Sequence, residues 1–324
     1  MGIGIRETDS DMGSEFTDGT GKGSEIVSGI FVALTTPMNA DETINSRCLD
    51  AKIKKLRHAG IRRIFCLGTN GEFYALGLEE KKQFLASVRE IAPPDTILSA
   101  GVGAVTTEEA ISMVKAASSY GYQLAAAITP YFLQLSENQL ERHYLRIADS
   151  SDIPVLLYNI PSRTGITISS QLAARLCGHP RIVGIKDSSG DLKSVKAFIE
   201  LQGPSFSVFS GTDSLILDAL VAGSVGAVSG MANIVPYLVQ SIYDTFRKGE
   251  HEKASRAQER LTSLRTLFEH GYSVSVIKLA ENLMGYGTGP GRAPANIYDV
   301  AVTRKVASIL GEFSLLRDSA AVGK

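Results

Sequence analysis

A lysine at the end of an apolar run is the most unusual residue of this sequence. Residues 182–186 read Ile-Val-Gly-Ile-Lys, and a run rich in β-branched residues predicts a short buried strand with Lys186 at its end. Taking an ammonium group out of water costs several kcal/mol unless the group is paired or loses its proton. Either the stem of Lys186 covers apolar surface while its head reaches solvent, or its amine forms a Schiff base with a carbonyl substrate.

Other groups able to do chemistry follow other apolar runs. Residues 68–72, Gly-Thr-Asn-Gly-Glu, can present successive backbone amides to an anion, although an ordinary Asn-Gly turn is the alternative. Tyr158 ends another run, and it is either a proton-transfer group or a half-buried tyrosine with a satisfied hydroxyl. Arg163 offers a planar fork for a carboxylate, or it is a solvated loop residue. For Asp187 and Asp213, which also follow apolar runs, a helix-capping role is the plainer interpretation.

These groups together fit the chemistry of a 2-keto acid. A Schiff-base lysine has to be neutral to attack a carbonyl, and a desolvated site favours the neutral amine. Residues 68–72 would hold the substrate carboxylate. The phenol of Tyr158 would shuttle protons during loss of water and enamine formation. The sequence therefore predicts that Lys186, Tyr158 and residues 68–72 meet at one site.

Other chemistries fit the sequence poorly. The five histidines fall in predicted helices or loops without metal-ligand spacing. No histidine stands beside a cysteine at the strand ends, and neither a G-x-S-x-G nor a P-loop motif occurs. We therefore expect no metal and no cofactor, the covalent Schiff base on Lys186 taking the place of one.

Eight repeats of a short apolar run followed by an amphipathic segment would position these residues. The expected strands are residues 30–34, 63–67, 96–100, 124–128, 154–158, 182–186, 206–210 and 225–229. Thr106 with Glu109, and Ser136 with Gln139, predict capping boxes at the start of two of the intervening helices. Mostly apolar strands alternating with helices indicate parallel strands buried on both faces, and eight of them close a (β/α)8 TIM barrel. A doubly wound open sheet is the alternative, but no GxGxxG motif follows the first run.

Composition and chain organisation are those of a globular α/β protein. The chain has 324 residues, of which 44% are hydrophobic and 21% charged, and its net charge of −1 gives no electrostatic case for binding nucleic acid or an anionic membrane. Three cysteines without CxxC spacing fit a reducing compartment, so a cytoplasmic location is expected. We expect a disordered leader or tag over residues 1–28, the barrel over 29–249 and a C-terminal helical region packed on the barrel over 250–324.

From about residue 29 to residue 310, the chain resembles the dihydrodipicolinate synthase / N-acetylneuraminate lyase family of class I aldolases. The motifs that carry the resemblance are Gly-Thr-Asn-Gly-Glu at 68–72, Tyr-Asn-Ile-Pro at 158–161, Gly-Ile-Lys-Asp at 184–187 and Gly-Thr-Asp at 211–213. Each motif is weak alone, but their order and spacing are highly specific. The resemblance implies a (β/α)8 barrel with a C-terminal helical region, usually as a homotetramer built as a dimer of dimers.

The resemblance also implies roles for single residues. It implies that Lys186 forms the Schiff base with pyruvate, that Tyr158 transfers protons, and that the backbone around Thr69 and Asn70 holds the pyruvate carboxylate. It implies that Val228 lies near the bound keto acid. Asp213, Ser214 and Ser188 stand where sugar-acid aldolases of the family contact substrate hydroxyls. The expected catalytic residues are Lys186, Tyr158 and Thr69, and the expected substrate-binding residues are Thr69, Asn70, Arg163, Val228, Gly211, Asp213 and Ser188.

The second substrate is less well defined by these motifs. Residues 162–165, Ser-Arg-Thr-Gly, are similar to the dihydrodipicolinate synthase version, in which the arginine binds the carboxylate of aspartate semialdehyde. Against this, Phe132 stands where synthases commonly carry a tyrosine that reaches the neighbouring subunit's site, Asn70 replaces a second hydroxyl, and residues 271–276 replace a proline-rich segment.

We therefore expect a small-molecule enzyme that condenses pyruvate with aspartate semialdehyde or a related aldehyde. The first alternative is an N-acetylneuraminate or 2-keto-3-deoxy sugar-acid aldolase. The second is a non-catalytic keto-acid-binding protein on the same barrel, which the fold alone would permit.

Overall fold

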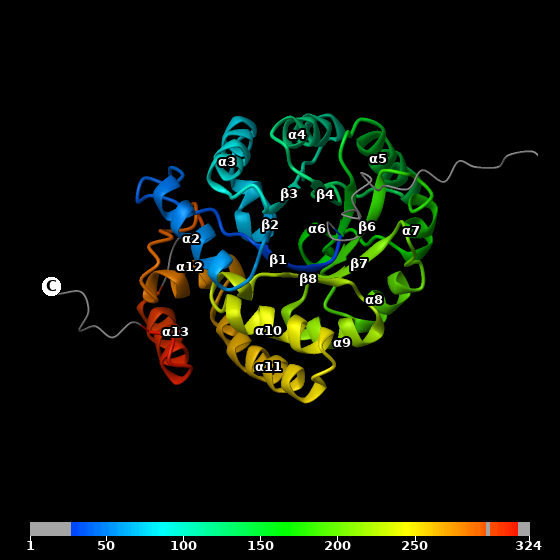
Figure 1. Ribbon diagram of the computed structural model, residues 1–324. Coiled ribbons are helices and arrows are strands. Elements are labelled where there is room, and N and C mark those ends of the chain that lie inside the picture. The colour runs from blue at the N-terminus through cyan, green and yellow to red at the C-terminus, as the bar shows by residue number, and fades with distance from the viewer. Residues whose placement is uncertain (1–26, 296–298, 317–324) are drawn as a thin grey trace, which may run out of the picture.

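The described residues, 27–295 and 299–316 of the computed structural model, form a closed barrel of parallel strands in sequence order (Figure 1). The strands are β1 (Gly29–Ala33), β2 (Arg63–Cys66), β3 (Ile97–Gly101), β4 (Leu124–Ile128), β5 (Val155–Asn159), β6 (Ile182–Asp187), β7 (Ser207–Ser210) and β8 (Gly226–Ser229). β1 pairs with both β2 and β8, which closes the sheet. The predicted TIM barrel is confirmed, and each strand starts and ends within one residue of its predicted limits. The predicted leader lies almost entirely outside the described residues.

Helices follow the strands and surround the sheet. They are α2 (Ser46–His58), α3 (Leu78–Ile91), α4 (Thr107–Ser119), α5 (Glu137–Asp149), α6 (Pro161–Thr164), α7 (Ser170–Leu176), α8 (Leu192–Ile199), α9 (Ile216–Ala222), α10 (Pro236–Arg247), α11 (His251–Leu264), α12 (Ser273–Leu283) and α13 (Val300–Glu312). Short 3-10 turns follow several strands and α11: η1 (Thr69–Gly71), η2 (Phe73–Ala75), η3 (Asp213–Leu215), η4 (Met231–Asn233) and η5 (Arg265–His270). In the described ranges, no helix is long and apolar enough to cross a membrane.

The barrel forms because its strands are apolar on both faces. The residues of β1, β4 and β5 are all buried, the inward side chains by one another and the outward ones by the helices. Gly184 in β6 is required by close packing, since a Cβ atom there would lie 2.1 Å from the carbonyl oxygen of Ser207 on β7. This glycine therefore lets β6 and β7 approach closely just before Lys186.

The two predicted helix starts behave differently. The reciprocal capping box of Ser136 and Gln139 opens α5 as expected. Thr106 also caps α4 by accepting from the Glu109 amide, but the Glu109 carboxylate bonds the Lys81 ammonium at 2.9 Å instead of returning to the cap. The second half of that predicted capping box is wrong because a buried lysine from the neighbouring helix competes for the carboxylate.

The C-terminal helices return to the mouth of the barrel. η5 contacts α11, α12 and α13, and α12 contacts the turns η1 and η4, which follow β2 and β8. Figure 1 shows α12 and α13 at one side of the barrel. Because parallel strands all end at this rim, the C-terminal region packs where catalytic groups of such barrels lie.

Candidate active site

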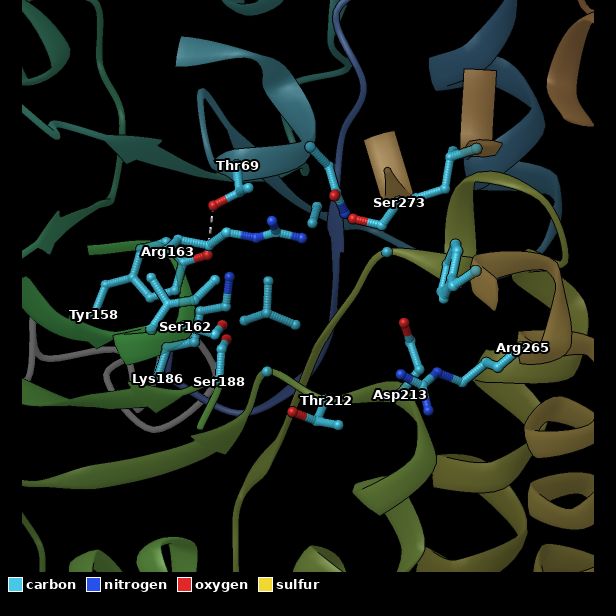
Figure 2. A pocket seen from close by; sticks show the side chains of 18 residues that line it. Thr69, Tyr158, Ser162, Arg163, Lys186, Ser188, Thr212, Asp213, Arg265 and Ser273 are labelled. Atoms are coloured by element: carbon cyan, nitrogen blue, oxygen red, sulfur yellow. Dashed lines mark hydrogen bonds between the residues drawn. The ribbon is translucent and has the colours of Figure 1, made fainter. Parts of the chain in front are cut away.

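A cavity of about 240 Å³ opens at the carboxyl ends of the strands (Figure 2). It brings together all of the predicted catalytic and substrate-binding residues. The other residues that line it are Ala33, Ile160, Ser162, Thr212, Gly230, Arg265, Phe268, Ser273 and Ile277.

Lys186 lies at the floor of this cavity and is 4% exposed. Its Nζ is 3.8 Å from the ring centroid of Tyr158 and 4.6 Å from that of Phe65. Within the described residues it makes no hydrogen bond or ion pair. Its Nζ packs instead against the faces of these two rings. The head of Lys186 therefore does not reach bulk solvent, unlike an ordinary snorkelling lysine. A lysine held this way is available to a ligand in the cavity.

Tyr158 stands beside Lys186 because their strands are in register. The Cα atoms of Tyr158 on β5 and Lys186 on β6 are direct partners across the two strands. The Tyr158 hydroxyl lies 3.1 Å from the Thr69 hydroxyl, and the rings of Tyr158 and Phe65 form a T-shaped contact with 5.9 Å between their centroids. This arrangement fixes the phenol next to the amine and links it to the segment that follows β2.

The segment of residues 68–72 forms the turn η1 and presents free amides. The amides of Gly71 and Glu72 close the turn by donating to residues 68 and 69. Thr36 holds the turn from outside, its hydroxyl donating to the Gly71 carbonyl at 2.7 Å. In the described part of the chain the amides of Thr69 and Asn70 have no acceptor, and both residues line the cavity. These two donors can receive a carboxylate.

A buried ion pair ties this segment to the C-terminal region. Glu72, which ends η1 in a left-handed conformation, pairs with Lys278 of α12, and both side chains are 0% exposed. The Arg292 amide donates to the Glu72 carboxylate at 2.7 Å, and Lys278 also donates to the Pro290 carbonyl at 2.8 Å. Burial lowers the pKa of Lys278, and the neighbouring Glu72 carboxylate opposes that effect. The position of residues 68–72 therefore depends on the return of α12.

Asp187, the neighbour of Lys186 in sequence, does not face the cavity. Its carboxylate accepts from the Asn159 amide group at 2.7 Å and from the amide and hydroxyl of Ser189 at 3.2 and 2.7 Å. The cap of α8 is Asp191 instead, so the predicted helix-capping role of Asp187 is wrong. Asp187 instead joins the ends of β5 and β6.

Asp213 lines the cavity, and its carboxylate is bonded to the barrel. It accepts from the hydroxyl of Ser229, the last residue of β8, and, at 3.2 Å, from the amide of Met231, the first residue of η4. Thr212 precedes the turn η3, and neither residue caps that turn with its side chain, so the capping prediction for Asp213 is also wrong. Burial raises the pKa of Asp213, and its hydrogen bond to Ser229 opposes that rise.

Arg163 stands at the mouth of the cavity on α6. Its guanidinium carbon lies 4.6 Å from the ring centroid of Tyr272, from the C-terminal region. On the other side of Arg163 and Thr69 is a second, more aromatic cavity of about 180 Å³. Phe132 lines neither cavity; it is 93% exposed and has a φ of 74°, in the left-handed region.

Four lining residues come from the C-terminal region and were not predicted. They are Arg265, Phe268, Ser273 and Ile277. No motif marks these residues, and the helical periodicity around them indicated only a packed appendage. They reach the cavity because η5, which Gly271 caps, and α12 both pack at the barrel mouth.

An eight-stranded barrel with a buried lysine beside a phenol at its catalytic rim has the architecture of a class I aldolase. A family model described as the dihydrodipicolinate synthetase family matches residues 26–312. The chain belongs to this family, and it is a lyase.

Relatives and solved structures of this family cover most of the chain. A 4-hydroxy-tetrahydrodipicolinate synthase of Methanoculleus marisnigri is 34% identical over 87% of this chain and 98% of its own. YagE of E. coli K12, a prophage protein of the dihydrodipicolinic acid synthase family solved with pyruvate, has a TM-score of 0.85 at 28% identity, over 89% of this chain and 99% of its own. The dihydrodipicolinate synthase of Acinetobacter baumannii, solved with pyruvate, has a TM-score of 0.86 at 29% identity, over 90% of this chain and 100% of its own.

Proposed function

We propose that the protein is a pyruvate-dependent class I aldolase in which Lys186 forms a Schiff base with the keto acid. The observation that carries this proposal is that Lys186 is buried at the cavity floor, with Nζ 3.8 Å from the Tyr158 ring centroid and without a hydrogen bond or ion pair in the described residues. An amine so placed is protected from water and open to a bound carbonyl. The two structural relatives solved with pyruvate support the choice of keto acid.

The chemistry then proceeds through a covalent intermediate. The neutral Lys186 amine attacks C2 of pyruvate, and the resulting carbinolamine loses water to give an imine. Loss of a proton from C3 gives an enamine, whose C3 forms a bond with the aldehyde carbon while the aldehyde oxygen takes up a proton and the imine is restored. Water then adds to C2 of this imine and breaks its bond to Lys186, which releases the product and the free amine. The Tyr158 phenol, 3.1 Å from the Thr69 hydroxyl, carries protons between these species, and the amides of Thr69 and Asn70 hold the pyruvate carboxylate. No external cofactor is needed.

For the second substrate we favour aspartate semialdehyde or a related aldehyde. Arg163 supports this choice, because its guanidinium lines the cavity and can bind a carboxylate with two parallel hydrogen bonds. The relative from Methanoculleus marisnigri, named 4-hydroxy-tetrahydrodipicolinate synthase, also supports it.

Cleavage of an N-acetylneuraminate or a 2-keto-3-deoxy sugar acid is the second candidate, and the cavity walls favour it. Hydroxyl groups of Ser162, Ser188, Thr212 and Ser273 line the cavity and can bind a polyol. Phe132 also lacks the hydroxyl that would complete a synthase-type relay.

The two candidates are separated by a coupled assay with purified protein. Aspartate semialdehyde with pyruvate is tested against a panel of 2-keto-3-deoxy acids, for the wild type and for Arg163→Ala. A synthase should lose most of its affinity for aspartate semialdehyde in this variant, whereas retained activity on a sugar acid would favour the second candidate. No turnover with any of these substrates, despite pyruvate binding, would favour the non-catalytic alternative.

The role of Tyr158 is tested by Tyr158→Phe, with Tyr144→Phe as the matched control. Tyr144 is also buried, but its hydroxyl has no hydrogen-bond partner in the described residues and lies outside the cavity. We expect Tyr158→Phe to lose about 10²-fold or more in turnover while pyruvate still binds, and Tyr144→Phe to keep its activity. Equal losses in the two variants would contradict the assignment.

The remaining proposals concern assembly and location. The family resemblance supports a homotetramer, which analytical ultracentrifugation would test. The cysteines, all of them free thiols in the structure, support a cytoplasmic location, which fractionation of the source cells would test.

We also propose that residues 29–249 and 250–324 unfold as one unit, because α12 contributes to the site.

A further inference from the structure

Arg265 is a second long cation in the wall of the cavity. It comes from η5 in the C-terminal region, whereas Arg163 comes from α6 after β5. Figure 2 shows the two arginines on opposite sides of the cavity, with Lys186 and Tyr158 on the side of Arg163. A ligand joined to Lys186 would therefore extend away from the reacting carbonyl towards Arg265.

No described residue accepts a hydrogen bond from Arg265. Its Nε is buried and has no hydrogen-bond partner, and in the described ranges its guanidinium makes no ion pair within 4.0 Å. Its guanidinium carbon lies 5.7 Å from the ring centroid of Phe268. A guanidinium in a cavity wall with a buried, unpaired donor is suited to binding an anion.

Asp213 does not explain the presence of this arginine. The two groups interact electrostatically, and Arg265 lies beside Asp213 in Figure 2. Yet the oxygens of Asp213 accept from the Ser229 hydroxyl and the Met231 amide, and no hydrogen bond joins Asp213 to Arg265. The donors of Arg265 thus remain available to a ligand.

The favoured aldehyde brings no further anionic group that could accept from the donors of Arg265. Arg163 can hold the one carboxylate of aspartate semialdehyde, and the amides near Thr69 serve the carboxylate of pyruvate. The ammonium group of aspartate semialdehyde would be repelled by another guanidinium. An additional anionic group on the substrate would accept hydrogen bonds from Arg265. The hydroxyl groups that line the cavity could bind the part of the substrate between its two ends.

We propose that Arg265 binds an anionic group, a carboxylate or a phosphate, at the end of the substrate remote from the carbonyl that reacts. The inference rests on the proposed function and narrows its substrate to an aldehyde with an anionic end, or to the longer keto acid that such an aldehyde yields. Arg265 is in this account a specificity-determining residue and takes no part in proton transfer.

The test compares aldehydes in pairs that differ in the terminal charge. Succinic semialdehyde with butanal tests a carboxylate, and glyceraldehyde 3-phosphate with glyceraldehyde tests a phosphate. Each is assayed with pyruvate for the wild type, Arg265→Ala, Arg265→Lys and the control Arg260→Ala. Arg260 is an exposed residue of the preceding helix that does not line the cavity.

The wild type should prefer the charged member of at least one pair. In Arg265→Ala, kcat/KM for that member should fall roughly 10–100-fold, mostly through KM, while the neutral member is unaffected. Arg265→Lys should keep part of the preference, and Arg260→Ala all of it. Preference in only one pair identifies the group as a carboxylate or a phosphate.

Equal use of charged and neutral members by the wild type would overturn the inference, as would an equal loss for both in Arg265→Ala. Reductive trapping of pyruvate by the same preparations separates this failure from a failure of the proposed function. Normal trapping without charge preference refutes only the role of Arg265, whereas absence of trapping on Lys186 in active protein refutes the Schiff-base function itself.

Discussion

Lys278→Met should destabilise the protein through the carboxylate that it leaves behind. Lys278 and Glu72 are both 0% exposed and pair with each other, and methionine keeps most of the lysine volume while removing the charge. The Glu72 carboxylate would then retain the Arg292 amide, at 2.7 Å, as its recorded hydrogen-bond donor. Breaking a buried ion pair in this way costs about 3–5 kcal/mol.

The size of this loss should depend on pH in a defined way. A buried carboxylate that has lost its cation can lose its negative charge by taking up a proton. Since glutamate side chains in water titrate near pH 4.3, that uptake costs about 4 kcal/mol at pH 7 and about 1 kcal/mol at pH 5. Relative to the wild type, Lys278→Met should therefore lose about 4 kcal/mol of unfolding free energy at pH 7 and about 1 kcal/mol at pH 5.

Urea unfolding followed by far-ultraviolet circular dichroism at both pH values measures this difference. The control is Glu72→Gln combined with Lys278→Met, which leaves no unpaired charge and should recover much of the loss at pH 7. A deficit of equal size at pH 5 and pH 7 would show that lost packing dominates. A deficit below about 1 kcal/mol at pH 7 would show that the Glu72 carboxylate does not need the charge of Lys278.

Three further predictions concern the site and the response to acid. Thr69→Val should lower turnover roughly 10-fold in steady-state assays, because it removes the hydroxyl bonded to the catalytic phenol but keeps the backbone amides. Burial lowers the pKa of His143 to about 4 from 6.5. The folded state therefore binds a proton at His143 less readily than the unfolded state. Up to about 3 kcal/mol of the unfolding free energy present above pH 6.5 should be lost as the pH falls to 4. In urea unfolding, His143→Gln should lose less unfolding free energy than the wild type over the same pH range. Gly211→Ala should slow imine formation roughly 10–100-fold in a time course of trapping, because its Cβ would lie 2.9 Å from Cε of Lys186 and 1.9 Å from Oγ of Ser188. An unchanged rate in either site variant, or an equal acid loss in His143→Gln, would count against these assignments.

The strands and the meeting of Lys186 with Tyr158 were predictable from local pattern. An all-apolar run such as residues 124–128 is readable because a parallel strand buried on both faces admits few polar residues. Once eight such runs close a barrel, the residues at their carboxyl ends must share one rim. The sequence did not give the register that makes Tyr158 and Lys186 direct partners, since pairing depends on the packing of both strands.

Contacts between distant parts of the chain were not predictable. Glu72 and Lys278 pair although they lie more than two hundred positions apart, and no sequence pattern around either residue predicts the other as its partner. Arg265 enters the cavity only because η5 returns over the barrel mouth. Asp187 illustrates the same limit at short range: its sequence position suits a helix cap, but Asn159 on the adjacent strand competes for the carboxylate.

Reductive trapping with borohydride in the presence of pyruvate shows directly whether Lys186 forms the Schiff base. Lys55 provides a matched control, because burial lowers its pKa to about 7 and it is chemically able to form an imine, yet it lies outside the cavity. In the wild type we expect mass spectrometry of peptides to find one reduced pyruvate adduct, on Lys186. The same adduct should form in Lys55→Met, and no adduct should form in Lys186→Met. An adduct on Lys55 or elsewhere, or active protein without an adduct on Lys186, would contradict the account.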